Sequence, residues 1–219
     1  MRSRKGFTMV EVVVVIGVVA LLAGVMVPLI SKNLEDAKVA RAKNEAVVLA
    51  AAIGNLYKDT GFWPSTNRNG PSGGVDRLAS NVNKVPRGQA RGAGSAARNW
   101  GRFGSVKALD DFLYYNNPDD NRGSGAQNER NQDYPTSGEF KWGGPYIEKP
   151  NVVDPWGNAY MVNARYFSGN PRYNGPKKHR VYVLSAGPNK VWDTSFSDNV
   201  GDGRDEIGGD DVGVTVALR

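Results

Sequence analysis

The sequence contains no cysteine, so neither a disulfide nor a thiolate metal site can hold the fold. It also contains a single histidine, His179, and Asp154 in a Pro-Trp-Gly turn has no evident acid–base partner. A catalytic site would therefore have no constellation of side chains to use, and we do not expect an enzyme. We expect His179 to begin a strand at the surface. Stability must come from packing or from an ion held by oxygen ligands.

Charge of one sign is scarce in two separate parts of the chain, although the net charge is +6. Residues 66–107 hold eight Lys and Arg against one acid, whereas residues 189–219 hold three against seven. The net charge therefore describes neither region. A length of 219 residues is enough for one compact domain of ordinary size.

Charge is also nearly missing from residues 7–30, where Glu11 is the only ionisable residue. As a helix, this segment would be about 36 Å long, enough to cross a hydrocarbon core of about 30 Å. Arg2, Arg4 and Lys5 precede it, and basic residues beside an apolar span favour the cytoplasm, so the C-terminal bulk would lie outside. A secretory signal would instead end in a small-residue cleavage site. The alternative is a plain signal anchor in which Glu11 is accidental.

The run from Lys5 to Glu11 resembles the site that prepilin peptidase recognises in type IV pilin-like proteins. This resemblance implies cleavage between Gly6 and Phe7, methylation of the new N-terminus, and Glu11 as the fifth mature residue. A carboxylate in lipid is costly, so Glu11 should have a partner. The family offers the N-terminal amine of Phe7 in a neighbouring subunit, and that charge pair would set the register of a homo-oligomeric filament. Pro28 lies where pilins often carry a proline, which can kink or locally melt the helix.

Residues 31–59 predict an amphipathic continuation of the helix, because apolar residues recur at alternating spacings of three and four. These residues are Val39, Ala42, Ala46, Leu49, Ile53 and Tyr57. Gly61 followed by Trp63-Pro64 predicts the end of the helix. The apolar stripe would face a head domain, and a two-helix coiled coil is the alternative.

Residues 60–141 predict a variable, basic loop region. The part from 66 to 104 is rich in Gly, Asn, Ser and Arg, so we expect it to be irregular and unable to build a core alone. A short helix is predicted near 105–115. Ser105 can cap this helix, and its shared face would carry Val106, Leu109, Phe112 and Leu113.

Strand signals appear late, within residues 142–219. They cover residues 160–167, 179–185 and 212–216, each bounded by Gly, Pro or Asn. A small antiparallel sheet followed by an acidic C-terminal loop is the natural interpretation. The predicted fold class is therefore α+β, with a long pilin-like N-terminal helix packed on a small antiparallel β-sheet.

Three segments of the second half resemble the major pseudopilin of type II secretion. They are Gly144-Pro145-Tyr146-Ile147, the run from Asp154 to Tyr160, and the run from Leu184 to Asn189. With the N-terminus, the resemblance covers roughly residues 7–64 and 142–212 and leaves the basic region unmatched. It implies a single-pass protein of the bacterial inner membrane, with its head in the periplasm. The subunit would then enter a short periplasmic filament that helps to export folded proteins, together with minor pseudopilins and an inner-membrane assembly platform.

The alternative within the same family is a major or minor type IV pilin. Such a subunit would form a cell-surface fibre for adhesion, motility or DNA uptake. The acid-rich C-terminal loop without cysteine favours the pseudopilin, because many pilins close this loop with a disulfide. The long basic region argues against it.

The resemblance also implies calcium in the C-terminal loop. The matching positions are Ala186, through its carbonyl, and Asn189, Asp210 and Asp211. Two departures weaken the match, because a neutral Asn189 stands where an aspartate is usual and residues 191–209 are longer than usual. Other acids could replace the lost charge or form a solvated loop, namely Asp198, Asp202, Asp205 and Glu206. Without an ion, neighbouring carboxylates would repel one another.

The basic region offers a possible contact with nucleic-acid phosphates and bases. Its basic residues are Arg68, Arg77, Lys84, Arg87, Arg91, Arg98, Arg102 and Lys107, and its aromatic candidates are Trp100 and Phe103. Solvated charge, or contact with the acidic loop of a neighbouring head, explains the pattern equally well. We therefore do not expect nucleic acid as a partner.

Overall fold

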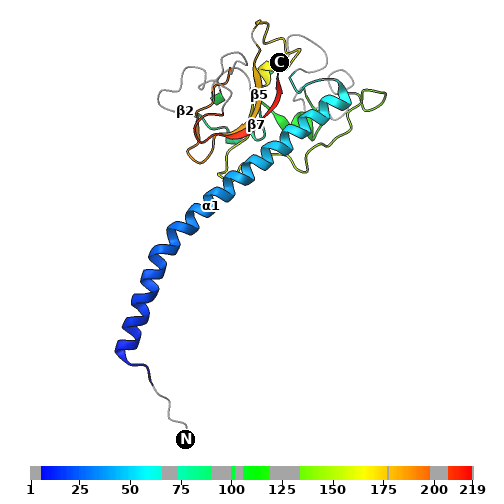
Figure 1. Cartoon of the computed structure of the whole chain (residues 1–219). Coiled ribbons are helices and arrows are strands. Elements are labelled where there is room, and N and C mark those ends of the chain that lie inside the picture. The colour runs from blue at the N-terminus through cyan, green and yellow to red at the C-terminus, as the bar shows by residue number, and fades with distance from the viewer. Residues whose placement is uncertain are drawn as a thin grey trace. The chain divides into compact units, whose positions relative to one another are not determined.

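The computed structural model describes residues 6–65, 74–89, 100–101, 106–118, 134–176, 178–197 and 207–218. The chain divides into two compact units, Met1–Ala40 and Arg41–Arg219. One helix, α1 (Met9–Thr60), runs through the boundary between them. Figure 1 shows α1 together with the strands of the second unit.

The first unit consists of the N-terminal part of α1. Its helix continues through Pro28 without a break, so no melted turn accompanies the proline. Its large apolar side chains are exposed, for example Leu21 at 75% and Val25 at 70%. By length and composition, this stretch is apolar enough to cross a membrane, and none of it is buried inside the protein.

The second unit contains a five-stranded sheet with the order β3-β1-β4-β5-β7. Its strands are β1 (Arg77–Ala79), β3 (Val106–Ala108), β4 (Met161–Val162), β5 (Arg180–Ser185) and β7 (Val212–Leu218). The β1–β3 pair is parallel, whereas the other neighbours are antiparallel. The sheet is therefore mixed: the predicted late strands β4, β5 and β7 pair antiparallel, and the parallel β1–β3 edge was not predicted. A separate parallel pair joins β2 (Gly88–Gln89) to β6 (Val191–Trp192).

The α+β class is confirmed, but several element boundaries differ from the prediction. In place of one helix over 105–115, β3 is followed directly by the short helix α3 (Leu109–Leu113). The predicted strand 160–167 is only the two-residue β4, followed by the 3-10 helix η4 (Ala164–Tyr166). Another 3-10 helix, η2 (Val82–Lys84), follows β1. The late strand signals correspond to β5 and β7.

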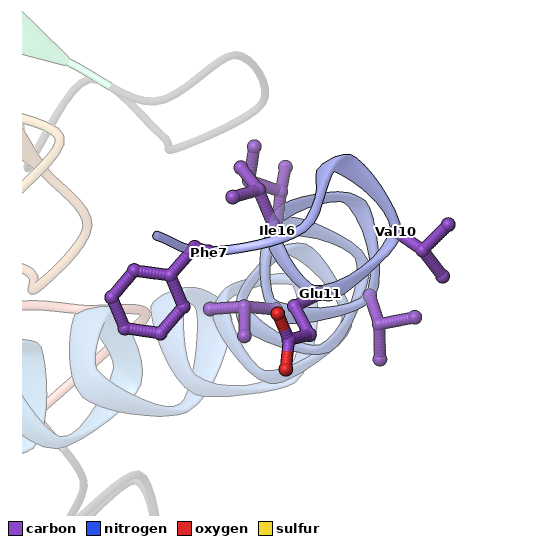
Figure 2. Close-up of a pocket in the computed structure, with 7 residues that line it drawn as sticks. Phe7, Val10, Glu11 and Ile16 are labelled. Atoms are coloured by element: carbon purple, nitrogen blue, oxygen red, sulfur yellow. The ribbon is translucent and has the colours of Figure 1, made fainter. Parts of the chain in front are cut away.

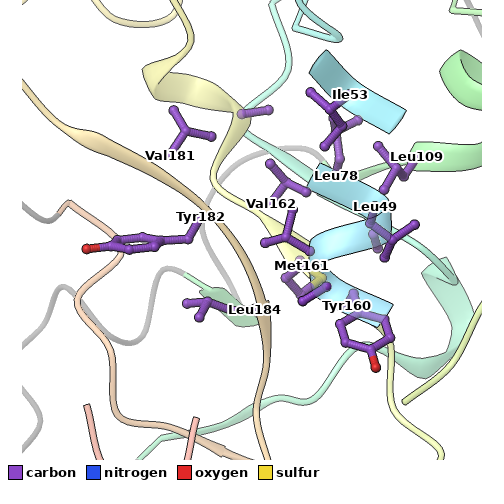
Figure 3. Close-up of a cluster of buried hydrophobic side chains, with 14 of the residues drawn as sticks. Leu49, Ile53, Leu78, Leu109, Tyr160, Met161, Val162, Val181, Tyr182 and Leu184 are labelled. Atoms are coloured by element: carbon purple, nitrogen blue, oxygen red, sulfur yellow. The ribbon is translucent and has the colours of Figure 1, made fainter. Parts of the chain in front are cut away.

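The core lies where the C-terminal part of α1 packs on the sheet. Figure 3 shows Leu49 and Ile53 of α1 near Leu78 of β1 and Val162 of β4. Burying a side chain such as Ile53 contributes about 1.5–3 kcal/mol relative to leaving it exposed. The buried helix face consists of Ala42, Ala46, Leu49, Ala52, Ile53, Leu56 and Thr60.

Two ends of the predicted stripe are wrong. Tyr57 is 42% exposed and Val39 is 38% exposed. After Ile53 the buried face continues at Leu56 and Thr60, because the next inward position is three residues on and not four. Because of this helical spacing, Leu56 is buried and the adjacent Tyr57 is not.

Hydrogen bonds from side chains also hold α1 to the rest of its unit. The Tyr160 hydroxyl donates to Glu45 Oε2 at 2.7 Å, and Arg41 Nε lies 2.8 Å from Glu45 Oε1. Burial raises the pKa of Tyr160, so its hydroxyl remains a donor. Near the end of the helix, the Tyr146 hydroxyl donates to Asp59 Oδ2 at 2.9 Å. These bonds fix the position of the helix along the sheet.

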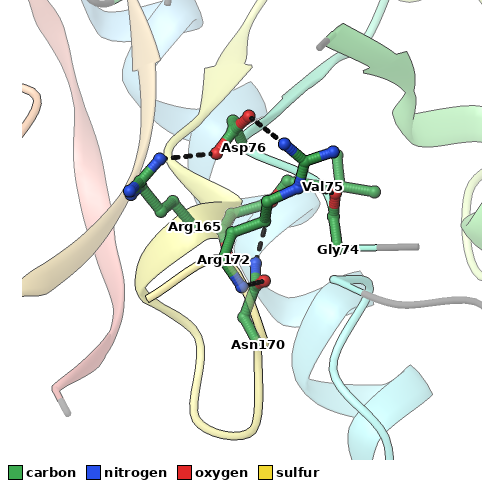
Figure 4. A network of polar contacts seen from close by, with 7 residues as sticks. Gly74, Val75, Asp76, Arg165, Asn170 and Arg172 are labelled. Atoms are coloured by element: carbon green, nitrogen blue, oxygen red, sulfur yellow. Dashed lines mark hydrogen bonds and ion pairs between the residues drawn. The ribbon is translucent and has the colours of Figure 1, made fainter. Parts of the chain in front are cut away.

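The basic region is part of this fold and not only an irregular loop. β1 lies inside the five-stranded sheet, and Trp100 is fully buried. Just before β1, the buried Asp76 carboxylate lies between two arginines, 2.9 Å from Arg165 Nη1 and 3.8 Å from Arg172 Nη1 (Figure 4). Asn170 Nδ2 donates to the carbonyl of Val75 at 2.8 Å. The expectation that residues 66–104 are irregular is therefore wrong at β1, and Trp100 joins a core that other segments build.

Candidate assembly site and acidic loop

The start of α1 holds the one carboxylate of the apolar segment. Thr8 is the residue before the helix, and its backbone N–H and its hydroxyl each donate to Glu11 Oε2 at 2.8 Å. The Glu11 N–H in turn approaches Thr8 Oγ1 at 3.3 Å. This reciprocal arrangement is a capping box, whose signature Thr-x-x-Glu is legible in the sequence but was not used in the prediction. The box gives Glu11 a local structural role besides any role between subunits.

The surroundings of Glu11 are apolar and open. Phe7 and Glu11 line the same groove of about 560 Å³ at the beginning of the helix (Figure 2). The other residues of this groove are Val10, Val12, Val14, Val15 and Ile16. Within the described residues, Glu11 Oε1 accepts no hydrogen bond. The site therefore presents one fixed negative charge on the exposed apolar part of α1, residues 9–30, here called the rod.

The predicted cleavage position lies just ahead of the helix, outside any helix or strand. Gly6 and Phe7 are both exposed, and nothing lies within 4 Å of a Cβ placed on Gly6. A protease could reach this peptide bond without unfolding any element. The cleavage itself stays a prediction.

The C-terminal acidic loop, defined here as residues 187–197 and 207–211, brings several of the predicted ion ligands together. Asn189 Nδ2 donates to Asp210 Oδ1, and the Asn189 N–H approaches Asp210 Oδ2 at 3.3 Å. Gly187 has a φ of +62°, and a Cβ there would collide with the carbonyl oxygen of Asp210. The turn that begins at Ala186 therefore lies directly against Asp210.

Asp193 is a carboxylate of this loop that sequence reasoning missed. Burial raises its pKa, and a hydrogen bond with the Asp210 side chain raises it further. A Cβ on Gly209 would collide with the Asp193 carboxylate, so the two segments of the loop, 187–197 and 207–211, are in close contact. The only signal in the sequence was its position between Asn189 and Asp210, in the segment that is longer than usual.

Asp211 lies deeper than its neighbours and is 7% exposed. Its Oδ2 accepts the N–H groups of Asp193 and Thr194 at 3.1 and 2.7 Å. Its Oδ1 is buried and has no hydrogen-bond partner within the described residues. Burial raises the pKa of Asp211 to about 6. An orphaned carboxylate oxygen of this kind would be satisfied by a proton or by a cation.

The fit to an oxygen-ligated cation is partial. No group of three or more His or acidic side chains in the described ranges is arranged to hold a metal ion. Calcium also accepts carbonyl and amide oxygens, but Asn189 turns its NH₂ toward Asp210 and uses its oxygen for the Val191 N–H at 2.6 Å. The other oxygen donors of the loop are the carboxylates of Asp193, Asp210 and Asp211, and they are not arranged around one point in this structure. The candidates Asp198, Asp202, Asp205 and Glu206 lie outside the described residues.

Two candidates for a nucleic-acid contact are inside the protein. Arg77 is buried and donates from Nη1 to the Trp100 carbonyl at 2.7 Å, and Trp100 is itself fully buried, so it cannot stack on a base. Lys84 and Arg87 are exposed, and Lys107 is partly buried. The remaining candidates lie outside the described residues, namely Arg68, Arg91, Arg98, Arg102 and Phe103.

The prediction that His179 lies at the surface is wrong. Its side chain is 5% exposed, its Nε2 lies 2.8 Å from the Tyr173 hydroxyl, and its ring contacts Tyr166 at a centroid distance of 4.2 Å. The flanking lysines and arginine suggested solvent, but two aromatic side chains cover the ring. His179 therefore serves packing.

Comparison with known proteins finds one matching family model and several similar proteins. Residues 1–27 match the family model described as the prokaryotic N-terminal methylation motif. The chain is 32% identical over 109 residues to type II secretion system core protein G of Pseudomonas aeruginosa, covering 49% of this chain and 66% of that protein. The same-named protein of Aeromonas hydrophila is 34% identical over 86 residues, covering 39% and 56%. Fimbrial protein EcpC of Eikenella corrodens is 31% identical over 64 residues, covering 29% and 42%.

The chain spans slightly less than two thirds of the length of the first of these relatives and less of the others. No solved structure matches the chain.

Proposed function

We propose that this chain, a type IV pilin-like protein similar to type II secretion system core protein G, is a structural subunit of a type II secretion pseudopilus. The observation that carries the proposal is the exposed apolar rod at the N-terminus, which begins with a methylation motif and holds a single carboxylate. A rod of this composition is unstable in water and needs lipid or other rods around it.

Maturation would begin at the exposed bond between Gly6 and Phe7. Prepilin peptidase would cut there and methylate the new N-terminus of Phe7. Before assembly the rod would lie in the inner membrane, with the second unit in the periplasm. Lipid tails are as apolar as valine, so leaving the bilayer for a filament must be driven by close packing and polar contacts between rods.

Glu11 would provide the decisive polar contact. The capping box already orients its carboxylate, so little side-chain freedom remains to be lost when a partner arrives. A neighbour's N-terminal amine would neutralise this charge, and both groups would be shielded together from the apolar surroundings. Because each subunit carries one acid and one amine, the contact is head-to-tail and generates an open helical filament. The inner-membrane assembly platform and minor pseudopilins would be the further partners.

The test of this function begins with the N-terminus of the protein from its own cells. Mass spectrometry of the membrane-extracted chain should show a mature protein that begins at Phe7 with a methylated amine. Deletion of the gene should abolish export of folded proteins, and the cleaved protein should restore it. A chain that keeps residues 1–6 in cells that possess the processing enzyme would refute the assignment.

We further propose that the acidic loop binds calcium. Asp210 and Asp211 would be ligands with the Ala186 carbonyl, and Asp193 would supply the negative charge that Asn189 lacks. The ion would supply positive charge to carboxylates that otherwise repel one another or share protons. The close approach of Asp193 to Asp210 and the orphaned Asp211 Oδ1 support this proposal.

A surface pilin is the second candidate. The similarity to fimbrial protein EcpC over 64 residues favours it, although that match is short. The two functions differ in where the filament ends. Immunogold labelling of intact cells and of thin sections would decide between them, because labelled fibres on intact cells support a pilin and periplasmic label seen only on sections supports a pseudopilin.

A further inference from the structure

Two segments of the basic region lie against the acidic loop. They are residues 85–89 and 100–101, here called the strap. β2 of the strap pairs in parallel with β6 of the loop, with Gly88 opposite Val191. A Cβ on Gly88 would lie 2.9 Å from the carbonyl oxygen of Lys190. The two backbones are therefore in close contact. A larger residue at position 88 would push them apart.

Two tryptophans fasten the strap to the loop. Trp192 Nε1 donates to the carbonyl of Pro86 at 2.9 Å, and Trp100 Nε1 donates to the carbonyl of Thr194 at 2.9 Å. Their rings stack with a centroid distance of 5.4 Å, and Phe196 meets Trp100 edge-on at 5.0 Å. All three rings are fully buried. Each indole thus satisfies its N–H by bonding to the opposite partner, so the contact is both apolar and directional.

The same stretch of the loop contacts the carboxylates on its other side. Asp193 and Thr194 donate their N–H groups to Asp211 Oδ2, and the Gly208 N–H donates to Thr194 Oγ1 at 3.0 Å. Residues 191–194 therefore lie between the strap and the turn that carries Asp210 and Asp211. Whatever orders this stretch also positions the acidic side chains.

We propose that the strap, and not an ion, is the element that orders the acidic loop of this chain. The buried indoles hold residues 191–194 from the side opposite the carboxylates, so the loop keeps its fold whether or not a cation is bound. An ion then changes the charge of the loop without being required for its structure. The basic region thereby acquires a role that its charge pattern did not indicate. The proposal does not depend on filament assembly.

Hydrogen–deuterium exchange on the full-length protein in detergent tests this proposal. Peptides that cover residues 187–197 and 207–212 are followed with calcium and with EDTA. In the wild type, exchange in these peptides should change by less than about threefold on chelation, because the strap keeps the backbone bonds closed. In Trp100→Ala, exchange should rise by at least about tenfold, most of all in EDTA.

Trp142→Ala is the matched control. Its indole also bonds to a carbonyl, from Nε1 to Phe112 at 3.1 Å, but it packs against Tyr146 and not against the loop. This variant should leave exchange in the loop unchanged. Trp100→Phe keeps an aromatic ring but removes the bond to Thr194 and part of the area stacked on Trp192, so its exchange should be intermediate. If Trp100→Ala does not fold, Trp100→Phe carries the comparison alone.

Two results would overturn the proposal. One is a wild-type loop that opens in EDTA as far as it does in Trp100→Ala, which would make the ion the ordering element. The other is unchanged loop exchange in the Trp100 variants. A Trp100→Ala loop that opens equally with and without calcium supports the strap and indicates that no ion contributes to loop order.

Discussion

The two halves of α1 use the same kinds of apolar residue in opposite ways. In residues 9–40 the large side chains are exposed, as at Leu21, which is 75% exposed. In residues 41–60 one face of the helix is buried against the sheet, as at Ile53 and Leu56, both at 0%, while Val47, Val48 and Tyr57 on the other faces are exposed. A stripe of apolar residues is satisfied only by a partner, and the second half finds its partner within the chain. The first half must find it in lipid or in other copies.

This difference separates assembly from folding. Substitutions in the first half should change the filament and leave the stability of the second unit alone, whereas substitutions in the second half should do the reverse. The five predictions below test that separation, beginning with the largest expected effect.

Glu11→Gln should lower the yield of sedimentable filament by roughly tenfold or more, because it removes the charge that would pair with a neighbour's amine. Glutamine keeps an acceptor oxygen for the capping box, so the helix should still begin at Met9. Cleavage, membrane insertion and the Tm of the second unit should match the wild type. Sedimentation of sheared filaments measures the yield, and undiminished assembly would remove the charge-pairing account.

Ile53→Ala should destabilise the second unit by about 2–5 kcal/mol, because it leaves a cavity between α1 and the sheet. This corresponds to a fall in Tm of roughly 4–20 °C for a unit of this size. Thermal unfolding of the full chain in detergent, followed by tryptophan fluorescence, measures it. Val13→Ala is the control in the first half and should leave the Tm unchanged. Equal shifts in both variants would break the comparison.

Asp76→Ala should destabilise the second unit by about 1–3 kcal/mol, because it leaves two guanidinium groups without their carboxylate. The cost stays below that of a fully buried pair, since the Arg165 and Arg172 side chains are 26% and 47% exposed and can rehydrate. Lys38→Ala removes an exposed ion pair of the first unit and serves as the control. An unchanged Tm in Asp76→Ala would mean that the attachment of β1 does not limit stability.

Removal of calcium should lower the Tm by no more than about 3 °C, for a contribution of at most about 0.7 kcal/mol to the second unit, because the strap already holds the loop in place. The shift should disappear in the double variant Asp193→Asn, Asp210→Asn, which lacks two of the proposed ligands. Glu11→Gln should keep the full shift, because its site lies in the other unit. Identical melting curves with and without chelator would end the calcium proposal.

In chelator, lowering the pH from 7 to 5 should stabilise the second unit through Asp211 by about 1 kcal/mol. The pKa of Asp211 in the fold is raised to about 6 by burial, above the ordinary value near 3.9. The folded state therefore holds the proton more tightly, and this contribution is complete below the unfolded pKa and lost as pH rises through about 6. Asp211→Asn should remove this component from the pH profile of the Tm. An Asp211→Asn profile that matches the wild type would contradict it.

The predictions for the N-terminal site depend on contiguous signals, and the site itself stays a prediction. The motif around Gly6 and Glu11 occupies seven neighbouring residues, and residues 1–27 match the model of the N-terminal methylation motif. The α+β class was predictable for a similar reason, since helix and strand periodicities are local. Even Thr8, which was missed, was legible in its spacing to Glu11.

The basic region and the acidic loop could not be predicted in the same way. Trp100 bonds to a residue 94 positions away, and no periodicity in a glycine-rich stretch announces such a contact. His179 looked solvated because Lys178 and Arg180 flank it, and Arg77 because it belongs to the basic region, yet their neighbours in space bury both side chains. Asp193 became a candidate ligand only once the fold placed it beside Asp210.

By itself, the sequence determined the apolar rod, its single acid and the position where the helix begins, because each depends on residues within a few turns of one another. Only the tertiary structure decided that the basic region supplies a strand to the sheet and a strap to the acidic loop. Burial is a property of segments that meet in space, and these segments are distant in the chain. Local charge and composition therefore do not predict which distant segments come into contact.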